Sequence, residues 1–320
     1  MRLYPLVLTL ALSVSANAWS QAWPTKPVRL IVPFAPGGAV DVTARTTAPA
    51  LGAKLGQQVV VENRGGAGGN IGVEVGAKSP PDGYTLLMGT SGQMAINPHM
   101  YAKLPFDPAK DFIAITQMGQ AVNALCVHPS LPARSVKEFI ALAKSQPNKL
   151  SFASGGIGAS DHIATELFMS MTGVKMLHVP YKGGAPAMID LLGGQVELGF
   201  STVATAMGPI KSGRLRALGV TSAKRFELLP DVPAIAEAVP GYEAVSWYGL
   251  FVPAGTPAAI VTRVHSEVVS VLQMPDVRRR LMESGVIPAS SASPDAFAAY
   301  VKAEGARWGK LIRANNIKAE

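Results

Sequence analysis

Short runs of β-branched and apolar residues alternate with longer helix-favouring stretches along the first third of the chain. The apolar runs span 28–32, 59–61 and 84–88, and each is followed within a few residues by a glycine-containing loop. The stretches between them, 40–55 and 70–78, are long enough to form helices. Alternation of strand, loop and helix is typical of a parallel sheet with crossover helices. We therefore expect an α/β fold.

The same alternation resumes after residue 120 and gives way to a helical last third. Further strands are expected at 150–153, 176–179, 196–200 and 215–220. Helices are expected beside them at 135–145, 161–171 and 185–192. Ser135, followed three residues later by Glu138, predicts a capping box at the start of the first of these helices. The last third is expected to form helices at 258–273, 276–284 and 295–314.

Two long apolar segments, 121–127 and 245–252, flank the second block of strands and helices. In the simplest topology the chain leaves a first lobe in the earlier segment and returns to it in the later one. We expect one lobe to hold 23–121 plus 248–320 and the other to hold 122–247. Two crossovers form a hinge, and a hinge between α/β lobes leaves a cleft that can take a ligand. The alternative topology is two independent consecutive domains.

The first residues have the pattern of an export signal. Arg2 supplies a positive start, 3–14 is apolar, and small residues follow at Ala16 and Ala18. The apolar run is shorter than the ~20 residues that a membrane span needs. We therefore expect 1–22 to be a signal peptide, cleaved after Ala18 or Ala22, and the mature protein to be periplasmic. The alternatives are an uncleaved anchor and a core helix.

Composition narrows the classes of partner. The chain has 320 residues, of which 48% are hydrophobic and 16% charged, so an extensive core is expected and disorder is not. The net charge of +8 favours anionic partners. The basic residues are scattered and do not alternate with aromatic ones, which argues against nucleic-acid binding. Because Cys126 is the single cysteine, the chain has no intramolecular disulfide and no cysteine-built metal site.

Two glycine-rich loops carry the candidate chemistry. Each of them, 33–41 and 154–162, follows an expected strand and opens an expected helix. Unpaired N–H groups and the positive dipole end make such a helix start a site for a carboxylate or phosphate. If the lobes face each other, both helix starts point into one cleft and no cofactor is needed. The alternative is a pair of ordinary glycine turns, with Asp41 serving only its own helix.

The common catalytic and cofactor motifs are absent or incomplete. The glycines at 65–72 do not have dinucleotide-binding phasing, and there is no phosphate-binding P-loop and no G-x-S-x-G sequence. The histidines lack metal-ligand spacing. Ser160, Asp161 and His162 are contiguous, whereas catalytic triads assemble from distant positions. We therefore predict no catalytic residue, no metal ligand and no cofactor, and we expect Cys126 to be a buried, inert thiol.

The chain resembles the substrate-binding proteins of tripartite tricarboxylate transporters, the TctC or Bug (Bordetella uptake gene) family. The resemblance extends from Trp23 to the end, and the order and spacing of its motifs make it specific. Its longest motifs are PFAPGGAVD (33–41), VVVENRGGAGGNIG (59–72), LPFDPAKDF (104–112), VPYKGGAPAMIDLLGGQVEL (179–198) and RLRALGVTSAKR (214–225).

The resemblance implies a two-lobe periplasmic binding protein of type II, the Venus-flytrap architecture. It implies a monomeric receptor that captures a small carboxylate and hands it to a permease with a large and a small membrane subunit. The ligand-binding positions of the family correspond here to Phe34, Gly37, Gly38, Asp41, Thr90, Ser91, Ser154, Ile157, Gly158, Ser160, His162 and Tyr181.

One departure from the family pattern concerns the strand that follows 194–196. Similar proteins often carry Phe-Asp-Asn there, whereas this chain has Phe200, Ser201 and Thr202. A hydroxyl then replaces an acidic lining residue, so we include Thr202 in the expected site and expect a ligand without an ammonium group. Two other functions stay open: a receptor whose loaded form binds a membrane sensor kinase, and an exported hydrolase.

Overall fold

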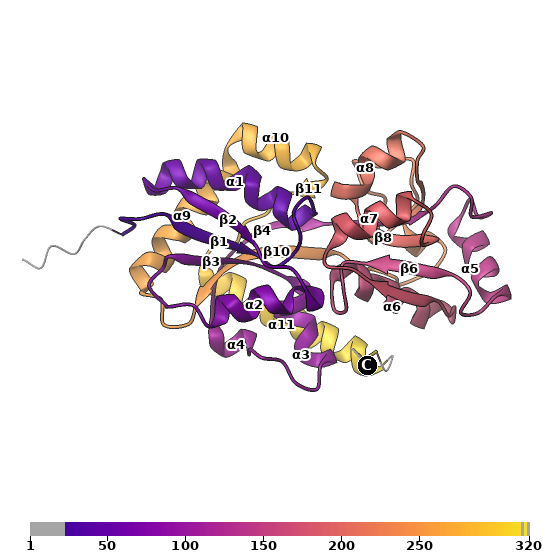
Figure 1. The fold of residues 1–320 in the computed structure, drawn as a ribbon, viewed down its shortest axis with the longest axis horizontal. Coiled ribbons are helices and arrows are strands. Elements are labelled where there is room, and N and C mark those ends of the chain that lie inside the picture. The colour runs from indigo at the N-terminus through magenta and orange to yellow at the C-terminus, as the bar shows by residue number, and fades with distance from the viewer. Residues whose placement is uncertain (1–22, 315–316, 319–320) are drawn as a thin grey trace, which may run out of the picture.

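The computed structural model describes residues 23–314 and 317–318, so the expected signal peptide lies outside the described residues. Two α/β lobes lie next to each other along the long axis of the molecule (Figure 1). The expected two-lobe fold is confirmed. The first sheet has six strands in the order β11-β4-β10-β3-β1-β2, and the second has five in the order β7-β6-β8-β5-β9.

The first lobe contains the two ends of the described chain. Its strands are β1 (Val28–Val32), β2 (Val59–Asn63), β3 (Thr85–Thr90), β4 (Phe112–Ala121), β10 (Ser246–Pro253) and β11 (Val286–Ile287). Its longer helices are α1 (Ala39–Leu55), α2 (Asn70–Ala77), α9 (Ala258–Gln273), α10 (Pro275–Glu283) and α11 (Pro294–Ala314). Its short helical segments are η1 (Ala67–Gly69), η2 (Gly92–Ile96), α3 (Asn97–Met100) and α4 (Pro108–Asp111).

The second lobe is one continuous insertion between β4 and β10. Its strands are β5 (Asn123–Val127), β6 (Ser151–Ser154), β7 (Leu177–Pro180), β8 (Leu198–Thr202) and β9 (Arg216–Val220). Its helices are α5 (Val136–Ser145), α6 (Ser160–Thr172), α7 (Gly184–Leu192), α8 (Val203–Lys211) and the short η3 (Ile235–Glu237).

Helices cover both faces of each sheet, so each lobe has two apolar layers. In the first lobe α1, α9 and α10 cover one face, while α2 and α11 cover the other (Figure 1). In the second lobe α5 and α6 pack on one face and α7 and α8 on the other. All eight residues of β10 are buried, as expected for a central strand with helices on both sides.

The two crossovers lie side by side. The apolar segment 121–127 is divided between two strands, because β4 ends at Ala121 and β5 begins at Asn123 in the other sheet. The returning strand β10 pairs antiparallel with β4, with Ser246 opposite Ala121. The Thr221 N–H donates to the Asn123 carbonyl over 2.9 Å, which ties the second lobe to the outgoing crossover. We propose that the lobes divide at these two crossings.

Most expected elements are confirmed to within a few residues, and the differences are local. The Ser135 hydroxyl accepts the Glu138 N–H over 3.2 Å, as a capping box requires. The Glu138 carboxylate, however, accepts the N–H of Arg134 over 2.7 Å and not that of Ser135. The elements that the sequence did not predict are the part of β4 before residue 121, the helix α8, the strand β11 and the short segments η1, η2, η3, α3 and α4.

The C-terminal helix contacts both lobes. The beginning of α11 buries Phe297 among the aromatic residues of the first lobe. Its far end carries Trp308 and Ile312, which join the apolar cluster that contains Phe168 and Tyr242 of the second lobe. The C-terminal helices therefore pack back on the first lobe as expected, and the last of them also supports the second.

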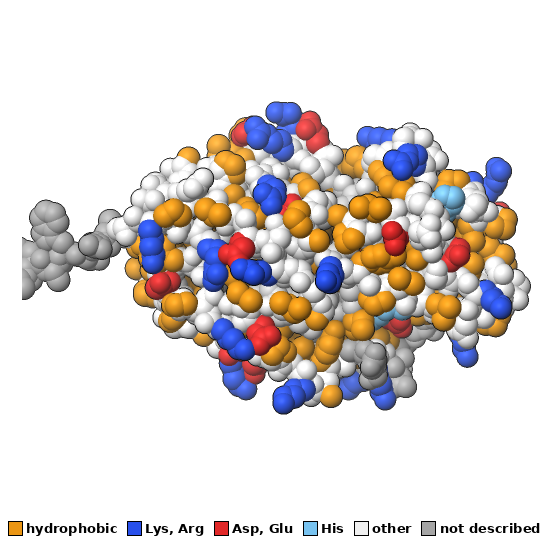
Figure 2. All heavy atoms as spheres, viewed as in Figure 1, with side chains coloured by type: hydrophobic (Ala, Val, Ile, Leu, Met, Phe, Trp, Pro, Cys, Tyr) orange, Lys and Arg blue, Asp and Glu red, His pale blue; other side chains and the backbone are white. Residues whose placement is uncertain are grey.

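Lys and Arg side chains are spread over both lobes on the face shown in Figure 2 and form no continuous basic patch there. Acidic side chains lie between several of them on the first lobe. None of the helices in the described residues is long and apolar enough to cross a membrane.

Candidate ligand-binding site

The two lobes are closed on each other. The Ala35 N–H of the first lobe donates to the Lys182 carbonyl of the second over 3.1 Å. The Tyr101 hydroxyl donates to the Ile157 carbonyl over 3.1 Å. Gly68 lies so close to the same carbonyl that a Cβ atom built on it would overlap the oxygen. These contacts join the two lobes at the loops that carry the expected site.

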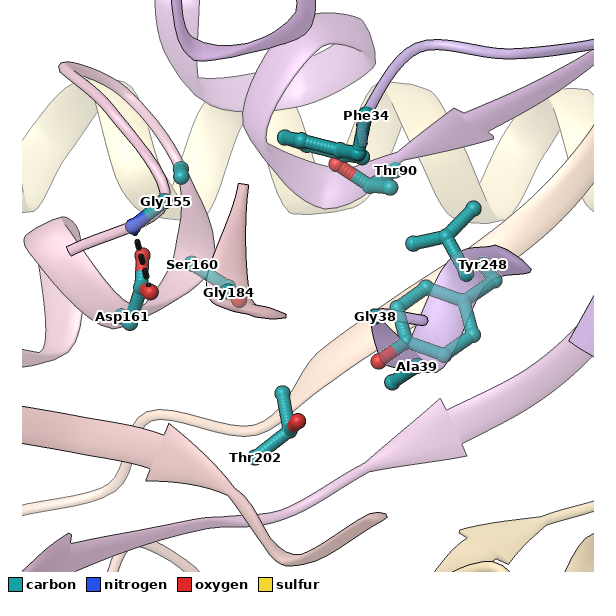
Figure 3. A pocket seen from close by; sticks show the side chains of 12 residues that line it. Phe34, Gly38, Ala39, Thr90, Gly155, Ser160, Asp161, Gly184, Thr202 and Tyr248 are labelled. Carbon is teal, nitrogen blue, oxygen red and sulfur yellow. Dashed lines mark hydrogen bonds between the residues drawn. The ribbon is translucent and has the colours of Figure 1, made fainter. Parts of the chain in front are cut away.

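A cavity of about 50 Å³ remains inside the closed cleft. In Figure 3, Phe34, Thr90 and Tyr248 of the first lobe face Ser160, Gly184 and Thr202 of the second lobe. The lining residues are Phe34, Gly38, Ala39, Val40, Thr90, Gly155, Ala159, Ser160, Asp161, Gly184, Thr202 and Tyr248. The two glycine-rich loops therefore meet at one cavity.

Four helices begin at this cavity. Gly38 is the N-cap of α1, Ser160 is the first residue of α6, Gly184 is the first residue of α7, and Thr202 is the N-cap of α8. Each helix start carries a partial positive charge and N–H groups without intrahelical partners. No Lys or Arg is among the described residues that line the cavity. The backbone therefore supplies the positive potential that a bound anion needs.

Hydroxyl groups complete the polar part of the wall. Those of Ser160 and Tyr248 have no hydrogen-bond partner among the described residues, so both are free to bind a ligand. The Thr90 hydroxyl donates to Gln93 Oε1 over 2.7 Å, and the Thr202 hydroxyl lies 3.0 Å from that of Thr205. Burial raises the pKa of Tyr248, and the nearby Asp161 carboxylate raises it further, so the phenol stays protonated.

Asp161 is the acidic residue in the wall. Its Oδ2 accepts the Gly155 N–H over 2.7 Å, and its Oδ1 accepts the His162 N–H over 2.9 Å. Burial raises the pKa of this carboxyl to about 6, against the effect of these backbone hydrogen bonds. Part of the site is therefore a carboxyl group that titrates near neutral pH.

Asp41 has an equivalent position in the other loop but a different environment. Its Oδ2 accepts the Gly37 N–H over 2.9 Å, and the same carboxylate binds Arg45 Nε over 3.0 Å and Asn63 Nδ2 over 2.8 Å. Although burial opposes ionisation, the hydrogen bonds from Arg45, Gly37 and Asn63 hold the pKa of Asp41 below its usual range. Asp41 does not line the cavity, and its contacts stabilise the loop that does.

A stack of rings stands behind the loop of the second lobe. His162 and His178 lie 4.3 Å apart between ring centroids, and Phe152 stacks on His178 at 4.7 Å. The Ser154 hydroxyl accepts the Gly156 N–H over 3.1 Å and lies 2.5 Å from His178 Nε2. Gly158 donates its N–H to His162 Nδ1 over 3.2 Å. These side chains fix the backbone of the loop rather than reach the cavity.

The remaining expected residues lie at the edges. Ile157 and Tyr181 line a separate groove of about 600 Å³ at the mouth of the cleft, where both lobes contribute. The Ser91 hydroxyl lies 2.9 Å from that of Ser246, beside the returning crossover. Gly158 packs against the side chain of Asn97 in the first lobe.

Five of the expected residues line the cavity: Phe34, Gly38, Thr90, Ser160 and Thr202. The expected residues that lie outside it are Gly37, Asp41, Ser91, Ser154, Ile157, Gly158, His162 and Tyr181. Sequence reasoning missed Ala39, Val40, Gly155, Ala159, Asp161, Gly184 and Tyr248.

Some of the missed residues could have been predicted from their position in the sequence, and others could not. Ala39, Val40, Gly155, Ala159 and Asp161 lie within or next to the two loops already singled out. Gly184, the second glycine of the pair Gly183-Gly184, lies between a predicted strand and a predicted helix. This loop resembles the two glycine-rich loops but contains fewer glycines. Tyr248 lies in an apolar strand and has no local signal at all.

Asn123, at the start of β5, is a further polar residue next to the site. It pairs directly with Thr202 across the sheet, so the two side chains lie on the same face. Both side-chain amide atoms of Asn123 are buried and lack a hydrogen-bond partner among the described residues. An unsatisfied buried amide of this kind is available to a polar group that enters from the cavity side.

Cys126 is buried in β5, as expected, and burial raises the pKa of its thiol to about 12. The thiol is therefore protonated and a poor nucleophile. Within the described part of the chain, no group of three or more His, Cys, Asp or Glu side chains could hold a metal ion.

Comparison with known proteins gives one family. The model of the TctC family, described as the tripartite tricarboxylate transporter family receptor, matches residues 43–317. The protein BugT of Bordetella pertussis is 35% identical to this chain, and the match covers 95% of this chain and 94% of BugT. The resemblance seen in the sequence motifs is thus confirmed over almost the whole length.

Two solved structures of related proteins contain carboxylates. Rpa4515 of R. palustris, solved with adipate, is 40% identical with a TM-score of 0.89, covering 92% of this chain and 99% of that one. MatC of Rhodopseudomonas palustris, solved with bound malate, is 30% identical with a TM-score of 0.87, covering 91% and 100% of the two chains.

Proposed function

This chain belongs to the tripartite tricarboxylate transporter receptor family, TctC, and from that membership we propose a specific role for it. The protein is a periplasmic solute receptor that captures a small carboxylate anion between its lobes. It then delivers the anion to a membrane permease of the tripartite type. Receptors of this family bind substrates, and we assign no catalytic residue.

The convergence of helix starts on one closed cavity is the observation that carries the proposal. N-termini from both lobes surround the space, and no cationic side chain takes their place among the described lining residues. A carboxylate bound there accepts backbone N–H and hydroxyl donors from both sides, so binding and closure stabilise each other. The adipate and malate in the two related structures belong to the same chemical class.

The expected site residues divide into two roles. We propose that Phe34, Gly38, Thr90, Ser160 and Thr202 contact the ligand, together with the Tyr248 hydroxyl. The residues outside the cavity hold the loops in shape, as Asp41 does for Gly37 and Ser154 does for Gly156. Rigid support of this kind keeps donors in place before the ligand arrives and lowers the entropic cost of binding.

Calorimetry with the purified mature protein tests the binding proposal. Adipate, malate, citrate and benzoate are titrated separately, with the uncharged diamide of adipic acid as the matched control. We expect at least one carboxylate to bind with a Kd of about 1 μM or lower, and the diamide to bind at least about 100-fold more weakly because it lacks the charge. Failure of every carboxylate, or equal binding of the diamide, contradicts the proposal. Release of a product from the bound acid would instead favour a hydrolase.

Delivery to a permease is supported by the groove at the mouth of the cleft. It is lined from both lobes, by Tyr101 and Lys103 on one side and Tyr181 and Lys182 on the other, so it has this shape only when the lobes are closed. Neither lysine has an acidic partner among the described residues. A membrane partner with acidic side chains could therefore distinguish the loaded receptor from the empty one.

Charge reversal tests this delivery step. The double variant Lys103→Glu, Lys182→Glu is expected to keep its ligand affinity within about twofold but to lower cellular uptake of the ligand by at least about fivefold. The control variant Lys54→Glu, Lys211→Glu carries the same charge change on exposed positions away from the groove and should leave uptake normal. Normal uptake by the groove variant argues against this docking face. Loss of a transcriptional response with uptake intact would favour the sensor-kinase alternative.

A further inference from the structure

We propose that this receptor takes up one proton together with its ligand, and that Asp161 is the residue that receives it. In the loaded state the Asp161 carboxyl is neutral and donates its O–H to a carboxylate oxygen of the ligand. The inference rests on the proposed function, because it concerns how a carboxylate is held in the same cavity. It assigns to the site the class of ligand that can accept such a donor, an ionised carboxylic acid.

The position of Asp161 puts a carboxyl group where the anion must lie. Its side chain is nine-tenths buried and lines the cavity from the first turn of α6. Its two oxygens already accept the N–H groups of Gly155 and His162 at 2.7 and 2.9 Å. These bonds fix the orientation of the carboxyl in the cavity wall, and Figure 3 shows it pointing at the Gly155 N–H.

Among the described residues, no cation forms an ion pair with this carboxylate, and the residues that line the cavity with it are uncharged. They include the phenol of Tyr248 from β10, Gly184 at the start of α7 and Thr202 at the start of α8. On the other side of the loop, burial lowers the pKa of His162 to about 3, with a smaller contribution from His178. Burial also lowers the pKa of His178 to about 4. Both rings are therefore neutral near neutral pH.

The next acidic group along α6, Glu166, does not make His162 a cation that could balance the charge of Asp161. Glu166 Oε1 lies 3.6 Å from His162 Nε2, and burial raises the pKa of Glu166. With His162 neutral, this contact is no ion pair. The environment of Asp161 thus consists of neutral groups and backbone dipoles on every side that the described residues provide.

Asp41, the matching aspartate of the first lobe, has a cationic partner, whereas Asp161 of the second lobe has none among the described residues. Both aspartates lie in the first turn of a helix and accept a glycine N–H from the preceding loop. Asp41, however, also binds Arg45 and Asn63 and does not line the cavity. Only Asp161 combines the loop-bracing role with exposure to the ligand space.

An incoming anion therefore meets a second negative charge in a desolvated site unless a proton neutralises one of them. Burial already raises the pKa of Asp161 to about 6 in spite of its backbone hydrogen bonds. A nearby ligand carboxylate raises this pKa further and draws a proton from solvent. An ammonium group on the ligand would be the other way to balance Asp161. The four converging helix starts oppose it, because their partial charges are positive.

Proton uptake can be measured on the wild-type protein without any variant. Calorimetric titrations of adipate and malate in buffers of different ionisation enthalpy, at about pH 7.5, are expected to show close to one proton taken up per ligand. Both acids are fully ionised there, so the uptake comes from the protein. By linkage, the association constant should fall by up to about tenfold per pH unit from about pH 6.5 to pH 8.

The variant Asp161→Asn separates this role from loop bracing. The Asn side chain keeps one oxygen, which can accept the Gly155 N–H, and presents a neutral N–H donor in place of the acid O–H. It gives up the oxygen that accepts the His162 N–H. Whatever its affinity at about pH 7.5, we expect this variant to show no proton uptake and a flat pH profile above about pH 6.5, because it has no carboxyl group at this position. Asp41→Asn changes the matched residue of the other loop, and it should retain the wild-type slope and proton uptake.

The outcomes distinguish the two proposals. Binding of a carboxylate with no proton uptake and a flat pH profile overturns the inference about Asp161 and leaves the receptor function intact. Binding of no carboxylate by the wild type overturns both. Preferential binding of amino acids, without proton uptake and abolished in Asp161→Asn, overturns the inference because Asp161 would then be the counter-ion of an ammonium group.

Discussion

Replacing Gly68 by alanine is expected to weaken ligand binding by at least about 100-fold while both lobes stay folded. Gly68 belongs to the first lobe, and in the closed form a Cβ on it would overlap the Ile157 carbonyl oxygen of the second lobe. The neighbouring backbone cannot yield easily, because a Cβ on Gly156 would in turn lie 2.8 Å from the Gly68 nitrogen. The lobes can avoid the overlap only by separating.

The size of this effect follows from the coupling of closure to binding. If the variant disfavours the closed form by about 2.7 kcal/mol, the apparent affinity falls about 100-fold, since only the closed form holds the ligand from both sides. Calorimetry measures the loss of affinity. Small-angle scattering should show that added ligand no longer makes the variant more compact, in contrast to the wild type.

Gly56→Ala is the matched control for Gly68→Ala. Gly56 also has a left-handed backbone, with φ of 78° against 63° for Gly68, so alanine carries a similar conformational penalty of roughly 1 kcal/mol at either position. A Cβ on Gly56, however, meets nothing within 4 Å. The control should therefore lose some stability and keep its affinity. Equal affinities in both variants would show that the contact between Gly68 and Ile157 is not needed for binding.

Replacing Gly184 by leucine is expected to abolish binding by filling the cavity. Gly184 is the first residue of α7 and lines the cavity, and a Cβ on it meets nothing within 4 Å. A leucine side chain can therefore extend into the open space without displacing the protein, but the about 50 Å³ available in the closed form leaves no room for a ligand beside it. We expect affinity to fall by more than about 100-fold, or about 2.7 kcal/mol.

The control for Gly184→Leu is Gly208→Leu. Gly208 lies in α8 of the same lobe, is exposed, and likewise has nothing within 4 Å of a Cβ atom. Both changes replace a helical glycine, which by itself raises helix propensity by up to roughly 1 kcal/mol, but a leucine at position 208 would also contact the ring of Pro209. Thermal unfolding should show that both variants stay folded, and calorimetry should show a loss of binding in Gly184→Leu alone. Retained binding in Gly184→Leu would place the ligand elsewhere.

The outlines of the fold could be predicted because they depend on local pattern. Strands such as 28–32 and helices such as 258–273 follow from apolar spacing and from the glycines that end them, which act within a few residues. The hinge could not be placed from the sequence, because the mostly apolar segment 121–127 contains the junction of two strands that belong to different sheets. The one polar residue in the segment, Asn123, lies where β5 begins, but a single polar residue does not by itself indicate a change of sheet.

Part of the candidate site could likewise be predicted from the sequence, and part of it depends on the tertiary structure. The glycine-rich helix starts at 37–41 and 154–162 are visible in the sequence, because a helix start and its dipole are properties of neighbouring residues. The sequence does not show that Tyr248 faces them, since that depends on how β10 returns between β3 and β4. It also does not separate residues that line the cavity, such as Ser160, from those that only hold the loop, such as His162.

The sequence by itself thus determined the family, the order of strands and helices, and the two backbone cradles for an anion. The tertiary structure decided which groups meet there, and it gave two similar aspartates opposite environments. The Asp41 carboxylate accepts hydrogen bonds from Arg45 and Asn63, whereas the described residues around Asp161 in the closed cleft are neutral. The physical reason is that backbone conformation responds to near neighbours, whereas desolvation and charge depend on residues that folding brings in from distant parts of the chain.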